Sequence, residues 1–251
     1  MTGAAGGPRG RSLLLALAHP DDESFFAAGT MRRYAEEGVS VTLCCSTRGE
    51  RGAVGTPPLA TVEELPAVRE RELRDAASVL GIPAPVFLPY EDQRLADAPP
   101  GEVRAAIVRL LREHRPAVVI TFDPDGGNRH PDHIAISRFT ADAVAAAADA
   151  RWLPELGAAH RVARLLWVAP VSPWEETDPA RLARHPGVDF IIDVRAQREA
   201  KARALAAHRT QRGGIGRLFL DRPDRDAVLG YETFRLGGGA PPHEIPADDI
   251  F

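Results

Sequence analysis

The sequence predicts a single α/β domain with a Rossmann-like, three-layer α/β/α architecture around a mostly parallel sheet. Three observations lead to this prediction. Between residues 12 and 150, short apolar runs alternate with segments of helical periodicity for four rounds, as βαβ units do. The first run, at 13–17, contains no polar residue, which is typical of a strand buried on both faces of a sheet. The 251 residues suffice for one large core, and they show neither an internal repeat nor a clean domain boundary.

The elements of this alternation follow from composition and periodicity. Four strands are expected where apolar or β-branched runs are bounded by turn residues, at 12–18, 39–46, 86–88 and 117–122. Four helices are expected where apolar residues recur at helical spacing, at 24–37, 61–80, 101–114 and from near 131 to near 150. Gly38 is placed to cap the first helix, Gly81 ends the second, and Pro66 falls in a first turn, where proline is tolerated.

The alternation loosens after residue 151. Two further strands are expected at 165–169 and 188–194, and one helix at 197–208. Residues 1–11 are Gly-rich and lack periodicity, so we expect a disordered N-terminal tail. The Gly/Pro-rich residues 237–251 are expected to form a flexible C-terminal tail. The functional domain is therefore expected to span residues 12–236.

The composition excludes some classes of partner. Hydrophobic residues make up 44% and charged residues 26% of the chain, the values of an ordinary soluble globular protein. The formal net charge of -4 gives no reason to expect nucleic acid as a partner. No run approaches the ~20 apolar residues of a membrane span, so no membrane association is expected. Cys44 and Cys45 are adjacent in a strand-like run and point to opposite faces, which indicates buried thiols rather than a disulfide or a metal pair.

The N-terminus imitates a short secretory signal. Two arginines precede the apolar residues 13–17, and the triplet 16–18 resembles a cleavage site. The apolar core is at the lower limit for such a signal, and cleavage after the triplet would leave His19 as the first residue. The same residues also make a good first strand, and buried thiols suit a reducing compartment. We therefore expect the protein in the cytoplasm.

Residues that can bind a metal follow two of the predicted strands. His19 and Asp22 come directly after the first strand, and His133 comes after the strand at 117–122. The carboxyl ends of parallel strands meet at one edge of an α/β sheet, where ligands bind. Two imidazoles and one carboxylate form a site with an open position, which is the pattern of catalytic zinc. The same ligand set can hold ferrous iron, so we favour zinc and keep other divalent metals open.

Neighbouring residues have the chemistry to complete a hydrolytic site. A metal with an open position lowers the pKa of a bound water to about 7. Asp21 lies between the first two ligands and is free to take a proton and pass it to a leaving amine. His130, if protonated, is placed to stabilise an oxyanion. Asp132 is expected to hold the imidazole of His130 in one tautomer.

Other interpretations of these motifs can be tested against the sequence. A single His-Pro-Asp sequence is usually a turn, but here two motifs, 19–22 and 130–133, each follow a predicted parallel strand. A dinucleotide-binding dehydrogenase needs Gly-x-Gly-x-x-Gly after the first strand, and the chain has His-Pro-Asp-Asp-Glu there, which excludes it. Loss of Asp21 would suggest a non-catalytic sugar- or metal-binding module. Asp21 is present, and the module stays open as an alternative.

The two motifs also carry a resemblance. Ala18-His19-Pro20-Asp21-Asp22-Glu23 and His130-Pro131-Asp132-His133 resemble the two signatures of the PIG-L family of metal-dependent deacetylases, also called LmbE-like proteins. The resemblance extends to the segments 47–50, 68–73 and 207–211, so it spans most of the chain from 12 to 211. It implies an enzyme that removes an N-acyl group, usually acetyl, from a small glucosamine-containing molecule and releases a free amine.

The resemblance implies roles for individual residues. It assigns metal ligation to His19, Asp22 and His133. It also makes Asp21 the general base and His130 the residue that stabilises the oxyanion. Arg69 matches an arginine that holds sugar hydroxyls in relatives, although the sequence alone places it on the solvated face of a helix. Glu50 and Asp92 fall in loops that line the substrate pocket in relatives. His208 and Gln211, one helical turn apart, fit a structural role as well as a substrate-facing one.

The chain departs from one branch of the family. In the mycothiol-pathway deacetylase, a tyrosine that assists the oxyanion stands two residues before the first histidine of the second motif, where this chain has Asn128. Arg129 fits other branches. The departure weakens an assignment to the mycothiol pathway. An amidase that cleaves a larger thiol- or antibiotic-type conjugate stays open, and so does homo-oligomerisation.

Overall fold

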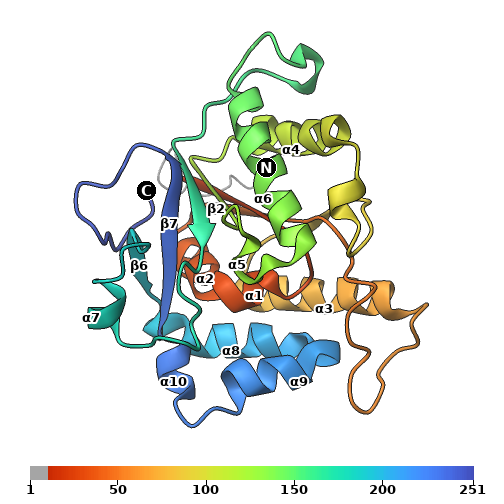
Figure 1. Ribbon diagram of the computed structural model, residues 1–251, viewed down its shortest axis with the longest axis vertical. Helices are drawn as coiled ribbons and strands as arrows, with labels where there is room; N and C mark the ends of the chain where they lie inside the picture. The colour runs from red at the N-terminus through yellow and green to blue at the C-terminus, as the bar shows by residue number, and fades with distance from the viewer. Residues whose placement is uncertain (1–10) are drawn as a thin grey trace, which may run out of the picture.

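A sheet forms the centre of the protein (Figure 1). It has seven strands in the order β3-β2-β1-β4-β5-β7-β6. This computed structural model describes residues 11–251, so the expected tail at 1–11 lies almost wholly outside the described residues. β1 pairs in parallel with both β2 and β4, and β7 runs antiparallel between β5 and β6. The strands are β1 (Ser12–Leu17), β2 (Ser40–Cys45), β3 (Val86–Phe87), β4 (Val118–Thr121), β5 (Arg164–Val168), β6 (Phe190–Asp193) and β7 (Tyr231–Gly239).

Helices cover both faces of the sheet. One layer contains α2 (Ala28–Glu36), α3 (Leu65–Leu80) and α8 (Arg198–Ala207), which pack on one another. The opposite layer contains α4 (Pro100–His114) and α6 (Pro131–Ala147) (Figure 1). Short helices complete the chain: α1 (Asp22–Phe26), α5 (Gly126–Arg129), α7 (Pro179–Leu182), α9 (Arg212–Ile215) and α10 (Arg225–Val228). Among the helices of the described residues, none combines the length and the apolar character that a membrane span requires.

The predicted architecture is confirmed. The first four strands alternate with helices and pair in parallel, and the side chains of residues 13–17 are at most 1% exposed. Gly38 and Gly81 have positive φ angles of 81° and 70° at the ends of α2 and α3, which explains why glycine stands there. Pro66 lies in the first turn of α3, as predicted.

The first helix differs from its prediction. The sequence predicts one helix over 24–37, whereas the structure has two, α1 and α2, separated at Ala27. The carboxylate of Glu232, on β7, accepts hydrogen bonds from the backbone N–H groups of Gly29 and Thr30 at 2.9 and 2.7 Å. The distant carboxylate therefore caps a new helix start, as acidic groups do at helix N-termini. Such a tertiary cap leaves no local signal in the sequence.

The C-terminal segment also differs from its prediction. The expected flexible tail at 237–251 begins inside β7, which the sequence analysis did not predict as a strand. Ile250 is fully buried, and its backbone N–H donates to the hydroxyl oxygen of Tyr34 at 3.1 Å. Asp249 accepts a hydrogen bond from the same Tyr34 hydroxyl at 2.9 Å. These contacts pack the chain end against α2.

The topology determines where a ligand can bind. From β1 the chain passes to β2 and β3 on one side, and then crosses to β4 on the other side of β1. Connections leave β1 and β4 in opposite directions, so a crevice opens beyond their carboxyl ends. The motif that follows β1 and the motif that follows β4 both lie at this switch point.

Candidate active site

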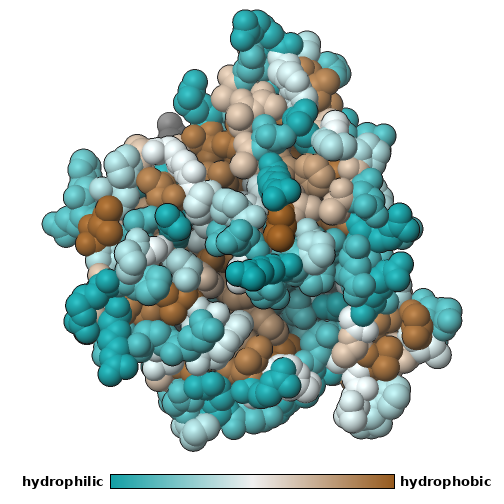
Figure 2. Space-filling model, viewed as in Figure 1, coloured by the Kyte–Doolittle hydropathy of each residue, from teal (hydrophilic) through white to brown (hydrophobic). Residues whose placement is uncertain are grey.

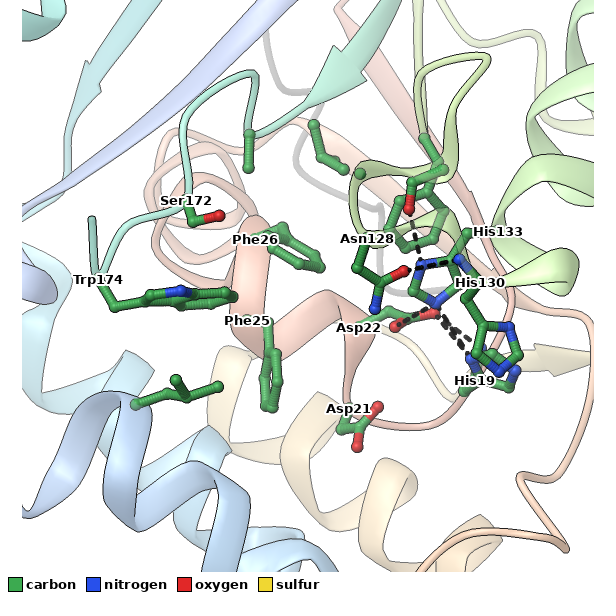
Figure 3. Close-up of a pocket in the computed structure, with 16 residues that line it drawn as sticks. His19, Asp21, Asp22, Phe25, Phe26, Asn128, His130, His133, Ser172 and Trp174 are labelled. Atoms are coloured by element: carbon green, nitrogen blue, oxygen red, sulfur yellow. Dashed lines mark hydrogen bonds and ion pairs between the residues drawn. The ribbon is translucent and has the colours of Figure 1, made fainter. Parts of the chain in front are cut away.

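Three side chains that the sequence predicts as metal ligands converge at the switch point (Figure 3). Nδ1 of His19 lies 3.2 Å from Nε2 of His133, which in turn lies 3.3 Å from Oδ1 of Asp22. Oδ2 of Asp22 lies 3.7 Å from Nδ1 of His19. All three residues are buried. The structure thus brings together the three residues that the sequence predicts as metal ligands.

The hydrogen bonds around the two imidazoles determine which nitrogens are free. Nδ1 of His133 lies 3.0 Å from the backbone oxygen of Gly126, which can only accept, so Nδ1 carries the proton and Nε2 has a free lone pair. Nε2 of His19 lies 3.2 Å from Oδ2 of Asp132 and 3.1 Å from Oδ1 of Asp92. In the neutral ring, the form that can bind a cation, that nitrogen carries the proton and Nδ1 has the free lone pair. Three electron-pair donors therefore face one another, an arrangement that fits a bound cation.

Asp132 lies behind His19 rather than beside the ring of His130, and Asp92, which also lines the polar cavity, contacts the same nitrogen of His19. We expected Asp132 to orient His130, but its carboxylate accepts hydrogen bonds from the ring of His19 and from the backbone N–H groups of Gln93 and Leu95. Burial lowers the pKa of His19, but the hydrogen bonds from its ring to Asp132 and Asp92 outweigh this and raise the pKa to about 10. The surrounding carboxylates thus favour a positive charge at this position.

Glu50 supports the carboxylates that contact His19. It was expected to line a substrate pocket, and in the structure its Oε1 accepts a hydrogen bond from the backbone N–H of Asp92 at 2.8 Å. Oδ2 of Asp92 accepts another from the backbone N–H of Arg51 at 3.0 Å. The loop that follows β2 and the loop that follows β3 are therefore fastened to each other beneath His19.

Asp21 is adjacent to the ligand cluster. Its φ of 119° lies in the region that favours glycine, so its backbone is strained, and its N–H donates to Oε2 of Glu23 at 3.0 Å. Its Oδ2 accepts a hydrogen bond from Arg69 at 3.1 Å. Burial raises the pKa of Asp21 to about 6, although Arg69 acts in the opposite direction. The carboxylate lies between Phe25 and His19 on the cavity wall (Figure 3).

Arg69 is buried rather than solvated. Its guanidinium donates to the backbone oxygens of Gly49 and Pro20 as well as to Asp21, and the residue is only 3% exposed. No space is left for a side chain at Gly49, since a Cβ there would lie 2.1 Å from Nη1 of Arg69. The arginine that the resemblance assigns to sugar hydroxyls therefore also fixes the strained turn that carries Asp21.

His208 and Glu23 form a second support that the sequence analysis did not identify. Nε2 of His208 lies 2.8 Å from Oε1 of Glu23, and both side chains are almost completely buried. Oε2 of the same carboxylate holds the backbone of Asp21. Burial lowers the pKa of His208, but the adjacent Glu23 carboxylate raises it above its usual value. The sequence leaves open whether His208 has a structural role or faces the substrate. In the structure it holds Glu23, which in turn holds the strained turn at Asp21, and this is a structural role.

His130 lies at the edge of the cluster. The backbone N–H of Asp132 donates to Nδ1 of His130 at 3.2 Å, so the ring proton of the neutral imidazole is on Nε2. Burial lowers the pKa of His130, and the neighbouring His19 and His133 lower it further. The ring is half-buried and its centroid lies 4.7 Å from that of His19. A neutral imidazole at this position still offers one N–H donor.

Two cavities meet at these residues. One has a volume of about 290 Å³ and is lined by all three ligand residues, by Asp21 and by a set of aromatic side chains. The other has a volume of about 240 Å³ and is lined mainly by polar residues, among them Arg51, Arg69, Asp92, Gln93 and Gln211. His19, Asp21 and His130 line both. The candidate reaction centre is therefore shared by an apolar cavity, partly visible as the brown hollow near the middle of Figure 2, and a polar one.

Comparison with known proteins identifies the family. A family model described as PIG-L, GlcNAc-PI de-N-acetylase, matches residues 14–144, which include both motifs. The chain belongs to the PIG-L family.

Relatives of this PIG-L protein share most of its chain. A 1D-myo-inositol 2-acetamido-2-deoxy-alpha-D-glucopyranoside deacetylase of Rhodococcus jostii is 37% identical over 80% of this chain and 82% of its own. A probable N-acetyl-alpha-D-glucosaminyl L-malate deacetylase 2 of Bacillus anthracis is 43% identical over 54% of this chain and 60% of its own. The crystal structure of the conserved protein TT1542 from Thermus thermophilus superimposes with a TM-score of 0.70 at 29% identity, covering 95% of this chain and 99% of that protein. This PIG-L protein therefore has the same fold over nearly its whole length.

Proposed function

We propose that this chain is a zinc-dependent hydrolase that removes the N-acetyl group from a glucosamine-containing small molecule and releases a free amine. The convergence of His19, Asp22 and His133, with free electron pairs directed at one another, carries the proposal. The names of the relatives supply the substrate class, since both are deacetylases of N-acetylglucosamine-type compounds. Membership of the PIG-L family is consistent with both the metal site and the substrate class.

The donor set supports zinc as the metal. His19, Asp22 and His133 would hold it, two through imidazole nitrogens and one through a carboxylate, which is the ligand pattern of catalytic zinc with an open position. Ferrous iron accepts the same set and is the alternative. When bound, a divalent metal lowers the pKa of water and polarises a carbonyl, so that hydrolysis can proceed near neutral pH.

Asp21 is proposed as the proton carrier. Its carboxylate lies on the wall of the cavity that contains the three proposed ligand residues, and Asp21 is not one of the three. It can take the proton of the attacking water and return it to the nitrogen of the leaving amine. Arg69 and Glu23 hold the carboxylate and the backbone of Asp21, so the strained turn keeps the base in place.

His130 is proposed as the oxyanion donor. The Nδ1 atom of its ring accepts from the backbone, so Nε2–H is available at the cavity edge. A hydrogen bond from this N–H to the developing oxyanion stabilises it without requiring a protonated ring. Asp132, together with Asp92, acts through His19 as a positioning residue, because its carboxylate contacts that ring.

The polar cavity is proposed to bind the sugar. Arg51, Gln93 and Gln211 present donors and acceptors there, and Arg69 and Asp92 also line it, whereas Glu50 does not. The small size of this cavity supports a small-molecule substrate. We also propose a cytoplasmic location, because Cys44 and Cys45 are free buried thiols, which persist in a reducing compartment.

The test is release of primary amine from a panel of N-acetylglucosaminyl compounds. The protein is assayed as purified, after removal of metal by a chelator, and after zinc is added back. We expect release that the chelator abolishes and zinc restores. Absence of release from every sugar, with zinc bound, would reject the deacetylase and favour the larger-conjugate amidase, and absence of both release and zinc would favour a binding module.

A further inference from the structure

An aromatic wall adjoins the proposed metal ligands. The cavity of about 290 Å³ that contains His19, Asp22 and His133 is closed on its other side by the apolar side chains Phe25, Phe26, Phe122, Trp174 and Leu218. These come from α1, from the end of β4, and from the segments that follow β5 and α9. Figure 3 shows Phe25, Phe26 and Trp174 facing the ligand cluster across the cavity.

The rings of this wall support one another. Phe122 stacks on His133 with centroids 3.8 Å apart, and Phe26 contacts Phe122 at 5.8 Å. Phe26 then contacts Trp174 at 6.2 Å, and Trp174 contacts Phe25 at 6.4 Å. The three pairs of Phe and Trp rings lie within the range of favourable aromatic contacts, and the rings of Phe122 and His133 are stacked almost parallel. The aromatic wall is therefore a continuous surface that starts at a metal ligand and extends away from it.

The distribution of polar groups decides which part of the substrate meets this wall. A sugar hydroxyl that is buried without a partner costs free energy, so the sugar belongs where donors and acceptors lie. The polar cavity on the other side of Asp21 offers Arg51, Gln93 and Gln211. Apart from the reaction-centre residues, the apolar cavity is lined by few polar side-chain groups: those of Ser172 and Asn128 and the indole N–H of Trp174. With the amine-bearing sugar on the polar side, the acyl group extends along the aromatic wall.

The cavity is larger than an acetyl group needs. A dry cavity of about 150 Å³ lined by apolar side chains holds a benzene molecule. The cavity here is about 290 Å³ and also contains the reacting carbonyl. An acetyl methyl would leave most of the aromatic wall in contact with water.

We propose that the acyl group this enzyme removes best is larger than acetyl, namely a medium-chain alkanoyl or an arylacyl group. The inference rests on the proposed function and specifies its substrate. The reaction remains hydrolysis: one water is consumed, the amide C–N bond breaks, a C–O bond forms, and the products are a carboxylic acid and the amino sugar.

The test compares kcat/KM for one glucosaminide carrying N-acetyl, N-hexanoyl or N-phenylacetyl groups, with the zinc-loaded full chain. Burial of each extra methylene is worth ~0.8 kcal/mol, or about fourfold. We therefore expect kcat/KM for the hexanoyl and phenylacetyl compounds to exceed that for the acetyl compound by at least about tenfold. A fall in kcat/KM with acyl size, while the acetyl compound is cleaved, would overturn the inference and leave the proposed function intact. Cleavage of none would reject the proposed function itself.

A variant narrows the cavity. Ser172 lines it and points into it beside Phe26 and Trp174 (Figure 3), so Ser172→Leu places an extra side chain there. We expect the ratio of kcat/KM for hexanoyl over acetyl to fall at least tenfold. The ratio is measured on the same protein, so partial misfolding cancels. Ser78→Leu, on the exposed side of α3, is the matched control and should leave the ratio unchanged. Equal ratios in all three proteins would contradict the assignment of the acyl group to this cavity.

An apolar aglycone is the other part of a substrate that would fit the apolar cavity, in place of a long acyl group. N-Acetylglucosaminides with methyl and octyl aglycones distinguish it from a long acyl group. A gain in kcat/KM with the octyl aglycone that Ser172→Leu removes, without any gain in the acyl series, would overturn the proposal. Equal values for the two aglycones together with a gain in the acyl series would support it.

Discussion

Nδ1 of His19 lies 3.2 Å from Nε2 of His133, although 114 positions separate the two residues in the sequence. His19 follows β1 and His133 lies in the first turn of α6, beyond the end of β4. The parallel pairing of β1 with β4 brings the two strand ends together. Each ring has its other nitrogen bonded to an acceptor, so two lone pairs face each other together with the carboxylate of Asp22. The predictions below depend on this arrangement.

Removal of one ligand tests the metal site. His133→Ala deletes one of three donors, and we expect zinc affinity to fall more than 100-fold, since changes behind the ligands already cost about 10–100-fold. Equilibrium dialysis with metal analysis measures the affinity. His185→Ala, at an exposed position outside both cavities, is the matched control and should bind zinc as the unaltered protein does. Stoichiometric zinc in His133→Ala would remove this residue from the ligand set.

The carboxylates behind His19 provide a second test. Asp92→Asn keeps the shape of the side chain but removes its charge next to Nε2 of His19. We expect zinc affinity to fall about 10–100-fold, because the ring loses its charged partner. Asp97→Asn changes an exposed residue that is paired with Arg94, and it serves as the control. If both variants bind zinc equally well, Asp92 has no influence on the ligand.

Asp21 separates metal binding from turnover. Asp21→Asn keeps the side-chain volume, and asparagine tolerates the positive φ of this position better than most residues do. We expect kcat to fall about 10²–10⁴-fold, because the proton carrier is lost, while zinc remains bound. Steady-state kinetics and metal analysis on the same preparation measure both quantities. Undiminished turnover would refute the assignment of the base.

A buried ion pair provides a test of the fold. Lys201 and Glu232 lie 2.7 Å apart with both side chains completely buried, and the same carboxylate caps the start of α2. Glu232→Ala leaves a buried ammonium group and two backbone N–H groups without partners. We expect the free energy of unfolding to fall by about 3–5 kcal/mol, measured by equilibrium denaturation in urea.

The control for this prediction is an exposed glutamate on α2, the helix that Glu232 caps. Glu36→Ala removes two exposed contacts, with Arg32 and with Gln197, so a change within about 0.5 kcal/mol is expected. Similar losses in the two variants would mean that the buried pair does not hold β7 against α2.

The proximity of the three predicted ligand residues could be predicted from the sequence because its information is local. His19, Asp22 and His133 each follow an apolar run that forms a parallel strand, and the rule for strand ends places them together. The layer behind them could not be predicted in the same way. Asp132 stands two residues from His130, yet its carboxylate contacts His19, because the backbone N–H groups of Gln93 and Leu95 hold it on that side.

The late part of the fold was the least predictable. β7 ends in three consecutive glycines and pairs antiparallel with two strands distant in sequence, so neither alternation nor composition indicates it. The division of the first predicted helix depends on Glu232 in that same strand. The aromatic wall had a partial signal, the pair Phe25-Phe26 directly after the first motif, but its other members come from later segments of the chain.

The most direct test of the account is titration of zinc into the chelator-treated protein. The rate of amine release from an N-acylglucosaminide is followed as zinc is added in steps. We predict that the rate rises in proportion to zinc and stops rising at one equivalent per chain, with amine and carboxylic acid released in equal amounts. A chelator-treated protein that is free of metal and releases amine at the full rate would contradict the central claim.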